Sequence, residues 1–198
     1  MSKLFLDAVK ARRTFYGLSK DVVVSEDRIK EIVREAVDHT PSAFNSQSSR
    51  VVVLFGEQSD KLWNIAKETL RKRVPAENCA ATEERINGFA SGYGTILFFE
   101  DHAVVKGLQE QYASYADNFP VWSNQSSGML QHVIWTALVA EGLGASLQHY
   151  NPLIDADVAQ TWQLPGDWKL IAQMPFGKPT FVPGDKEFMS QSDRVKFF

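Results

Sequence analysis

The sequence predicts a single α+β domain in which helices surround a small buried sheet. Two kinds of segment indicate this class: short apolar runs rich in β-branched residues, typical of buried strands, and longer segments whose apolar residues recur at helical spacing. The chain has 198 residues, of which 44% are hydrophobic and 23% charged. Because no low-complexity linker or internal repeat divides it, we expect one domain spanning residues 1–198.

The first clear helix follows Ser25, a favourable N-cap with two acidic residues after it. Its apolar residues keep helical spacing until Pro41, whose ring disfavours helical geometry at the preceding residue. The apolar run 51–55 then predicts a strand buried on both faces that ends at Gly56. The next helix carries one apolar stripe, formed by Trp63, Ala66 and Leu70.

Three more strands are expected further along the chain. Residues 95–99, Thr-Ile-Leu-Phe-Phe, predict a buried strand that leads into an acidic pair. Residues 145–149 predict a short strand, and residues 168–174 predict a last strand that stops before Pro175. The tail from Pro179 onward is expected to be polar and irregular.

A central helix is predicted between these strands, over residues 127–140. Its apolar residues keep helical spacing, yet Met129, Trp135 and Val139 make its other side apolar too, so we expect neighbours on both sides. Gly142 and Gly144 end the helix, since glycine accepts the left-handed conformation found at helix C-termini.

Charge and composition exclude several classes of protein. There are 24 acidic against 21 basic residues, which argues against a dedicated nucleic-acid binder. A charged residue within the first seven is unlike a secretory signal, and the most apolar stretch, 133–140, is far shorter than a bilayer crossing requires. The single cysteine, Cys79, fits a reducing compartment. We therefore expect a cytoplasmic protein with no membrane and no nucleic-acid partner.

Two short segments carry candidate binding groups. One is Pro41-Ser42-Ala43-Phe44-Asn45-Ser46-Gln47, whose hydroxyls, amides and backbone N–H groups can surround a planar polar ligand. Its alternative interpretation is an ordinary helix-to-strand turn. The other is Arg12-Arg13-Thr14, because paired guanidiniums bind phosphate in a bidentate manner. A solvated basic helix end is the alternative there.

Other chemistries find little support in the sequence. Gly142-Leu143-Gly144 begins like a dinucleotide fingerprint, but its sixth position is Leu147 and a helix precedes the strand, the reverse of the required order. No two histidines have helical metal-ligand spacing, so no metal site is expected. An aromatic segment offers candidate substrate contacts, although core or dimer-interface packing is the alternative; we select Tyr115, Phe119 and Trp122.

In this order, and with Gly142-Leu143-Gly144-Ala145 after the late helix, these segments resemble the nitroreductase family of FMN-dependent oxidoreductases. Residues 95–101 and 147–152 are similar to a compact subgroup from bacteria and yeasts, often labelled oxidoreductase or fatty-acid-repression protein. The likeness extends from Arg12 to Lys186. It implies a nitroreductase-like fold with a small central mixed sheet, in an intertwined homodimer with two FMN sites, each built from both chains.

The resemblance also implies the residues of these sites. The family's Arg-Arg-Ser motif for the phosphate and ribityl end is matched by Arg12, Arg13 and Thr14. The segment that crosses to the partner's flavin is matched by Ser42, Ala43, Phe44 and Asn45, with Gln47 in its continuation. The stretch that passes the isoalloxazine is matched by Leu147, Gln148 and His149, although a plain strand-end role is the alternative for the histidine. The C-terminal phosphate-binding base is matched by Lys186.

Four positions depart from the family's pattern. Tyr16 stands where a further basic residue is frequent, and Phe188 stands where an arginine is common. Ser48-Ser49 replaces the usual Pro-Trp after the glutamine.

The function implied by the resemblance is reduction of nitroaromatics, quinones or related small acceptors with electrons from NADH or NADPH. Since the flavin carries the electronic step, no catalytic side chain is expected. Nicotinamide and acceptor would take turns on one flavin face, which implies ping-pong kinetics. Two alternatives remain: a flavin-binding regulatory or stress-response protein with incidental reductase activity, and a flavin-free interaction module that kept the scaffold.

Overall fold

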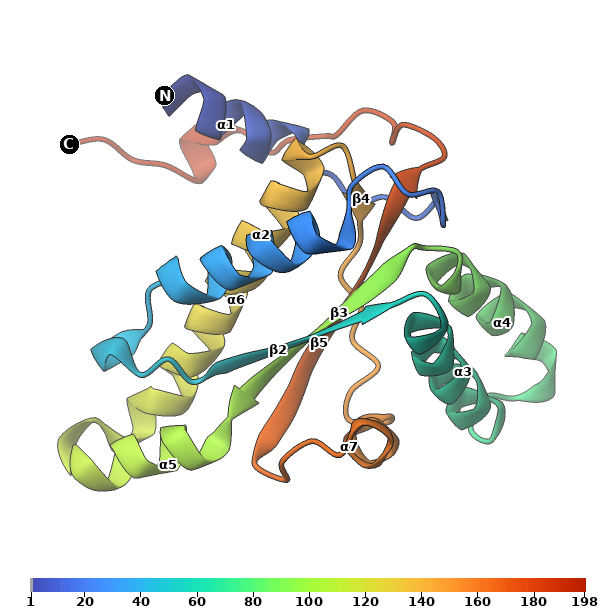
Figure 1. Ribbon diagram of the computed structural model, residues 1–198. Coiled ribbons are helices and arrows are strands. Elements are labelled where there is room, and N and C mark those ends of the chain that lie inside the picture. The colour runs from blue at the N-terminus through green and yellow to red at the C-terminus, as the bar shows by residue number, and fades with distance from the viewer. Residues whose placement is uncertain (1) are drawn as a thin grey trace.

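The computed structural model describes residues 2–198, with all of their side chains except those of Ser2, Lys3 and Ala76. Its centre is a five-stranded sheet in the order β1-β5-β3-β2, with β4 also paired to β5 (Figure 1). The strands are β1 (Leu18–Ser19), β2 (Ser49–Phe55), β3 (Gly94–Asp101), β4 (Gly144–Ala145) and β5 (Trp168–Pro179). The four strand pairs within this range are antiparallel, and the parallel component of the expected mixed sheet is one bridge, between Thr14 and Ala145.

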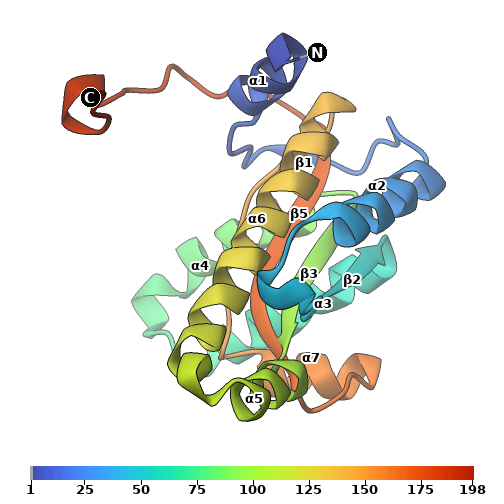
Figure 2. The same ribbon diagram turned by 90° about the vertical axis from the view of Figure 1, so that its left-hand side faces the viewer.

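Helices cover both faces of the sheet (Figures 1 and 2). They are α1 (Ser2–Ala11), α2 (Glu26–His39), α3 (Glu57–Arg71), α4 (Ala76–Ala90), α5 (His102–Gln111), α6 (Phe119–Ala140) and α7 (Asp155–Trp162). One face is covered by α2 and α6, the other by α3, α4 and α7. None of the helices in residues 2–198 combines the length and apolarity that a bilayer crossing requires.

The predicted start of the chain's first clear helix is confirmed. The hydroxyl of Ser25 accepts a hydrogen bond from the Arg28 N–H at 3.2 Å, and α2 ends at His39, two residues before Pro41. The strand predicted over 51–55 is also confirmed, as part of β2. Its expected burial on both faces is wrong, because β2 lies at the sheet edge, where only Leu54 of its seven residues is buried.

The last two strands differ from prediction in length. The strand expected over 145–149 is reduced to β4 and an isolated bridge between Gln148 and Gln173. Conversely, β5 continues through Pro175. The carbonyl of Pro175 accepts from the Ser146 N–H at 3.2 Å. In an antiparallel sheet the N–H and C=O of one residue face the same neighbouring strand. The backbone N–H that Pro175 lacks would therefore face β4, so the hydrogen bonds between β5 and β3 are kept.

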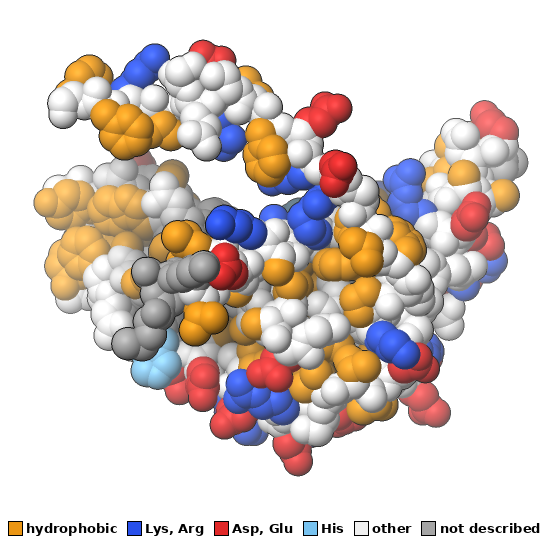
Figure 3. Space-filling view, turned by 90° about the horizontal axis from the view of Figure 1, so that it is seen from above, with side chains coloured by type: hydrophobic (Ala, Val, Ile, Leu, Met, Phe, Trp, Pro, Cys, Tyr) orange, Lys and Arg blue, Asp and Glu red, His pale blue; other side chains and the backbone are white. Residues whose placement is uncertain are grey.

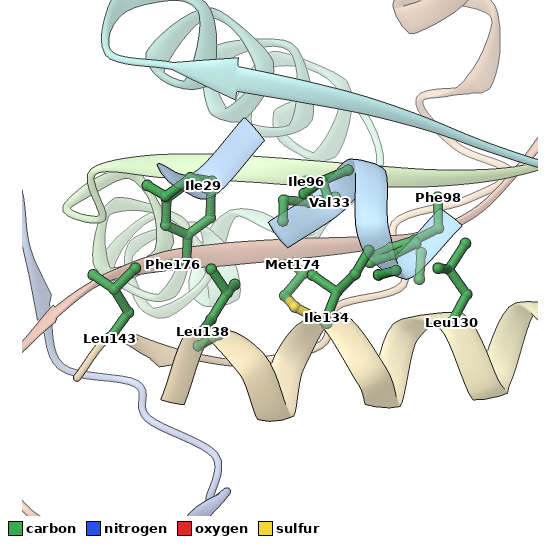
Figure 4. Packing of buried hydrophobic residues seen from close by; sticks show 13 residues of the cluster. Ile29, Val33, Ile96, Phe98, Leu130, Ile134, Leu138, Leu143, Met174 and Phe176 are labelled. Atoms are coloured by element: carbon green, nitrogen blue, oxygen red, sulfur yellow. The ribbon is translucent and has the colours of Figure 1, made fainter. Parts of the chain in front are cut away.

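The long helix α6 starts at Phe119, earlier than residue 127, and packs on one face of the sheet. Figure 4 shows Leu130, Ile134 and Leu138 pointing from it toward the sheet, with Leu130 beside Phe98 of β3 and the other two near Met174 and Phe176 of β5. Fully burying each such side chain contributes roughly 1.5–3 kcal/mol. This chain covers the other side of the helix only in part: Met129 is 42% and Val133 43% exposed, whereas Trp135 and Val139 are half-buried.

The C-terminal segment, residues 180–198, runs past α1 and ends in an exposed stretch. Figure 3 shows an open gap between this segment and the body of the molecule, with Lys and Arg side chains along its rim. The segment exposes a series of large apolar side chains, namely Phe181, Val182, Phe188, Met189, Val195, Phe197 and Phe198. A single chain therefore leaves apolar surface exposed both here and on α6.

Candidate functional site

The predicted phosphate-binding segment lies directly after α1, against β4. Thr14 forms a parallel bridge with Ala145, and the Phe15 N–H donates to the Ala145 carbonyl at 2.9 Å. This close approach requires glycine at position 144, because a Cβ there would lie 2.9 Å from the Cβ of Phe15. The structure thus brings together two segments that are more than a hundred residues apart in the sequence.

The contacts of the paired arginines involve a ring and a carbonyl. The guanidinium of Arg12 lies over the ring of Trp135. The Nη2 atom of Arg13 donates to the Gly184 carbonyl at 2.7 Å. Gly184 lies two residues before Lys186, so Arg13 contacts the C-terminal segment close to that lysine. We call Arg12–Thr14, residues 145–149 and residues 184–186 the basic half-site.

A buried glutamine holds the middle part of this half-site. Gln173 of β5 exchanges two backbone hydrogen bonds with Gln148, at 2.7 and 2.9 Å. Its side-chain oxygen accepts from the Tyr150 N–H at 2.7 Å. Leu147 packs against the core, while His149 is exposed. Gln173 is not predicted from the sequence, although an amide between the apolar residues Ala172 and Met174 of a strand is the kind of signal that marks a structural hydrogen bond.

The small polar segment, residues 42–47, forms a loop that includes a single 3₁₀ turn; we call it the polar loop. Phe44, Asn45 and Gln47 have φ values of 56°, 51° and 49°, a left-handed conformation that costs a residue with a Cβ about 1–2 kcal/mol. The Gln47 N–H donates to the Ser42 hydroxyl at 3.0 Å. This segment is therefore not an ordinary turn: its strained backbone is held by specific hydrogen bonds.

The base of the polar loop is fastened to the end of β3. Ser48 and Ser49 both donate to the carboxylate of Glu100, which is 1% exposed. Burial raises the pKa of Glu100, and the two hydroxyl donors and the charge of Arg50 oppose that rise. The sequence predicts Glu100 only as the end of a strand, because its partners lie about fifty positions away.

Phe44 stands at the centre of an aromatic cluster beside the polar loop. Its ring centroid lies 6.0 Å from that of Trp122 in a stacked arrangement, 4.8 Å from Tyr112 and 6.0 Å from Tyr115. Phe44 is 51% and Tyr115 47% exposed, whereas Phe119 is 2% exposed and lies behind Phe44 at 5.3 Å. Phe119 thus supports the cluster from behind, and its predicted contact with substrate finds no support in this structure because so little of its side chain is exposed.

The polar loop and the basic half-site lie apart in one chain. Phe44 stacks on Trp122 and Arg12 on Trp135, and these tryptophans are thirteen residues apart on α6. At 1.5 Å per residue this corresponds to about 20 Å along the helix. Within one chain, the predicted site residues therefore form two separate groups.

The comparisons with known proteins agree with this fold. Residues 9–178 match the model of the Nitroreductase family. Nitroreductase CinD from Lactococcus lactis, solved with chloramphenicol, has a TM-score of 0.90 and 48% sequence identity over 98% of this chain and 99% of its own. Its structure with 4-nitrophenol gives a TM-score of 0.89 and 49% identity over the same shares. Nitroreductase FRM2 of Saccharomyces cerevisiae is 32% identical over 191 residues, 94% of this chain and 93% of its own. The chain, an oxidoreductase by this kinship, belongs to the nitroreductase family.

Proposed function

We propose that the protein is an FMN-dependent oxidoreductase of the cytoplasm that uses NADH or NADPH to reduce nitroaromatics, quinones or related small acceptors. The observation that carries the proposal is the basic half-site. There Arg12, Arg13 and residues 184–186 lie at one edge of the fold. The guanidinium of Arg12 contacts the Trp135 ring and that of Arg13 contacts the Gly184 carbonyl, instead of carboxylates. Such unneutralised cations suit a phosphate dianion.

The residues present fit FMN in their donor chemistry. Each guanidinium has five N–H donors, of which Arg13 uses one on Gly184, and the Thr14 hydroxyl adds another donor beside them. Neutral amide and hydroxyl groups of the polar loop and Gln148 suit the polar edge of a flat ring. Bound FMN supplies the ring that accepts and passes on reducing equivalents.

The chain's own residues would bind FMN and orient its ring. Arg12, Arg13 and Lys186 would neutralise the phosphate, with Thr14 as an uncharged donor. Gln173 keeps Gln148 in place through two backbone hydrogen bonds, so that the segment beside the ring is rigid. The side chains of Tyr115 and Trp122 offer aromatic faces on which a planar acceptor can stack.

We infer further that the working protein is a homodimer in which the polar loop of one subunit completes the basic half-site of the other. The separation of about 20 Å between the two groups along α6 supports this, since one chain does not bring them to one ligand. The uncovered apolar surface on α6 and on the C-terminal segment is of the kind that a partner buries.

A nitroaromatic acceptor is supported by the aromatic cluster. A shallow cavity of about 290 Å³ lies between Phe44, Trp122 and Met129. The similar protein CinD has been solved with 4-nitrophenol and with chloramphenicol. Electron-poor aromatic rings stack well on tryptophan and tyrosine, which favours this class of acceptor.

The test is anaerobic stopped-flow reduction of the FMN-reconstituted protein by NADH and by NADPH, followed by reoxidation with a nitroaromatic and a quinone. Rapid bleaching and reoxidation are expected, and steady-state turnover with both substrates should give parallel double-reciprocal plots. A bound flavin that neither nicotinamide reduces would favour the flavin-binding regulatory protein. A dimer that takes up no FMN would favour the interaction module.

A further inference from the structure

Glu100 holds two consecutive residues at the base of the polar loop. Its Oε2 accepts from the Ser48 hydroxyl at 2.6 Å, and its Oε1 accepts from the Ser49 hydroxyl at 2.5 Å. Consecutive side chains of an extended strand point to opposite faces. One carboxylate can gather both hydroxyls only where the chain turns, which is the point at which the polar loop enters β2.

Further hydrogen bonds from the backbone and from Arg50 hold the same part of the chain. The Asp101 N–H donates to the Ser48 carbonyl at 2.9 Å, and Arg50 bridges the Asp101 carboxylate, at 2.9 Å, and the Gln47 carbonyl, at 2.6 Å. The last residues of β3 therefore fix the positions 47–50. We call Glu100, Ser48 and Ser49 the carboxylate clamp.

The polar loop needs such a restraint. Three of its residues adopt left-handed backbone conformations, and each would gain about 1–2 kcal/mol by leaving them. Inside the loop three hydrogen bonds oppose this relaxation: the Gln47 N–H donates to the Ser42 hydroxyl, and the Asn45 and Ser46 N–H groups close the 3₁₀ turn onto the carbonyls of Ser42 and Ala43. The clamp supplies two hydrogen bonds to one carboxyl group in a water-excluded place, where hydrogen bonds are electrostatically stronger than in water.

The clamp also gives a physical reason for the departure from the family's pattern at Ser48-Ser49. A proline and a tryptophan at these positions would offer no hydroxyl, and the buried carboxylate would lose both of its side-chain donors. A buried carboxylate without donors is strongly destabilising. The two serines and Glu100 are therefore chemically matched to each other.

Resting on the proposed function, we propose that Glu100 is a positioning residue: through Ser48 and Ser49 it keeps the polar loop in the strained conformation that contacts FMN bound to the partner subunit. It touches no reacting atom. Its contribution is the geometry of residues 42–47, so it acts on flavin affinity through the loop.

The experiment measures hydrogen exchange of the peptide that covers residues 42–49 together with FMN affinity. Glu100→Ala and the double variant Ser48→Ala/Ser49→Ala should each speed exchange in this peptide about tenfold or more and weaken FMN binding about tenfold. The triple variant should be no worse than either, since all three residues form one unit. Glu100→Gln should restore both readouts to nearly wild-type values, because its amide offers one acceptor to one serine and one donor to the other. Glu110→Ala, which removes an exposed glutamate of α5, is the matched control and should change neither.

Several outcomes would overturn the inference. These are unchanged loop exchange in Glu100→Ala, accelerated exchange with unchanged FMN affinity, additive effects in the triple variant, or faster exchange spread evenly over β3 and β5. If Glu100→Ala does not fold, the serine pair decides alone. Wild-type protein that binds no FMN would instead contradict the proposed function, and the exchange of residues 42–49 would then decide the clamp by itself.

Discussion

The guanidinium carbon of Arg12 lies 4.5 Å from the centre of the Trp135 ring, where the end of α1 meets α6. A cation above an aromatic face gains about 0.5–2 kcal/mol, depending on its exposure. Stacking uses the face of the guanidinium and leaves the N–H groups in its plane available to an anion. Trp135 therefore holds Arg12 in place without competing for the phosphate that we propose it binds.

The first prediction concerns the phosphate contacts. Arg12→Ala with Arg13→Ala should weaken FMN binding by a few kcal/mol, because each charge-assisted hydrogen bond contributes roughly 1.5–3 kcal/mol. Titration of the apoprotein with FMN, followed by flavin fluorescence, measures the change. Lys10→Ala, which removes an exposed base of the preceding helix α1, is the matched control and should bind FMN like the wild type. Undiminished affinity in the double variant would remove both arginines from the phosphate site.

The second prediction separates the role of Trp135 from general packing. Trp135→Leu should weaken FMN binding a few-fold, in keeping with the loss of a partly exposed cation–π contact. The same substitution in an Arg12→Ala background should have little further effect, because the group that Trp135 holds is then absent. Equal effects in both backgrounds would mean that the tryptophan acts through packing alone. The measurement is again FMN titration, completed as a double-mutant cycle.

A third prediction addresses the acceptor. Tyr115→Ala should raise KM for 4-nitrophenol or a related nitroaromatic by roughly two- to tenfold, the equivalent of one lost aromatic contact. FMN affinity should stay unchanged, since Tyr115 belongs to neither phosphate nor ring contacts. Val121→Ala removes an exposed side chain of the neighbouring helix and serves as the control. An unaltered KM in steady-state assays would place the acceptor elsewhere.

The fourth prediction is a pH dependence of stability. Burial raises the pKa of Glu100 in the folded chain above its value in the unfolded chain. The folded state then binds this proton more tightly, so the corresponding stability is present below the unfolded pKa and is lost as the pH rises through the folded pKa. Relative to Glu100→Gln, the wild type should therefore lose free energy of unfolding over the pH range above about 4.5, the ordinary pKa of a glutamic acid.

Urea unfolding of both proteins across this range measures the difference. Taking the difference between variant and wild type removes the contributions of carboxylates that the two proteins share. Asp101, Arg50 and His102 are the charged or titratable neighbours, and they are identical in both proteins. A difference that stays constant with pH would show that the pKa of Glu100 is the same in the folded and unfolded chains.

Local signals predicted a large part of the fold. The cap at Ser25 and the proline at position 41 act within a few residues, so the bounds of α2 followed directly from the sequence. The apolar run at 95–99 lies in the middle of the sheet and is buried along its whole length, as its composition indicates. These elements depend little on what packs against them.

The features of the fold and of the site that the sequence did not predict depend on pairing between distant segments. The exposure of β2 follows from its place at the sheet edge, and its own apolar sequence is equally compatible with a central strand. Pro175 stays inside β5 because of the side on which β4 pairs, a relationship that local propensity does not contain. The partners of Glu100 are likewise set by the register of β2 on β3, which pairs Ser49 with Glu100.

The last prediction tests whether the polar loop and the basic half-site serve one flavin across two subunits. Asn45→Val places a β-branched residue at a φ of 51° and should distort the polar loop. Homodimers of this variant, and homodimers of Arg12→Ala/Arg13→Ala, should each bind FMN weakly. When the two variants are unfolded and refolded together, half of the dimers are mixed, and each mixed dimer has one site with an intact loop from one subunit and intact arginines from the other. About a quarter of all sites should then regain wild-type affinity. If both groups instead acted within one chain, no site in the mixture would be intact and no affinity would return, although differently tagged subunits co-purify.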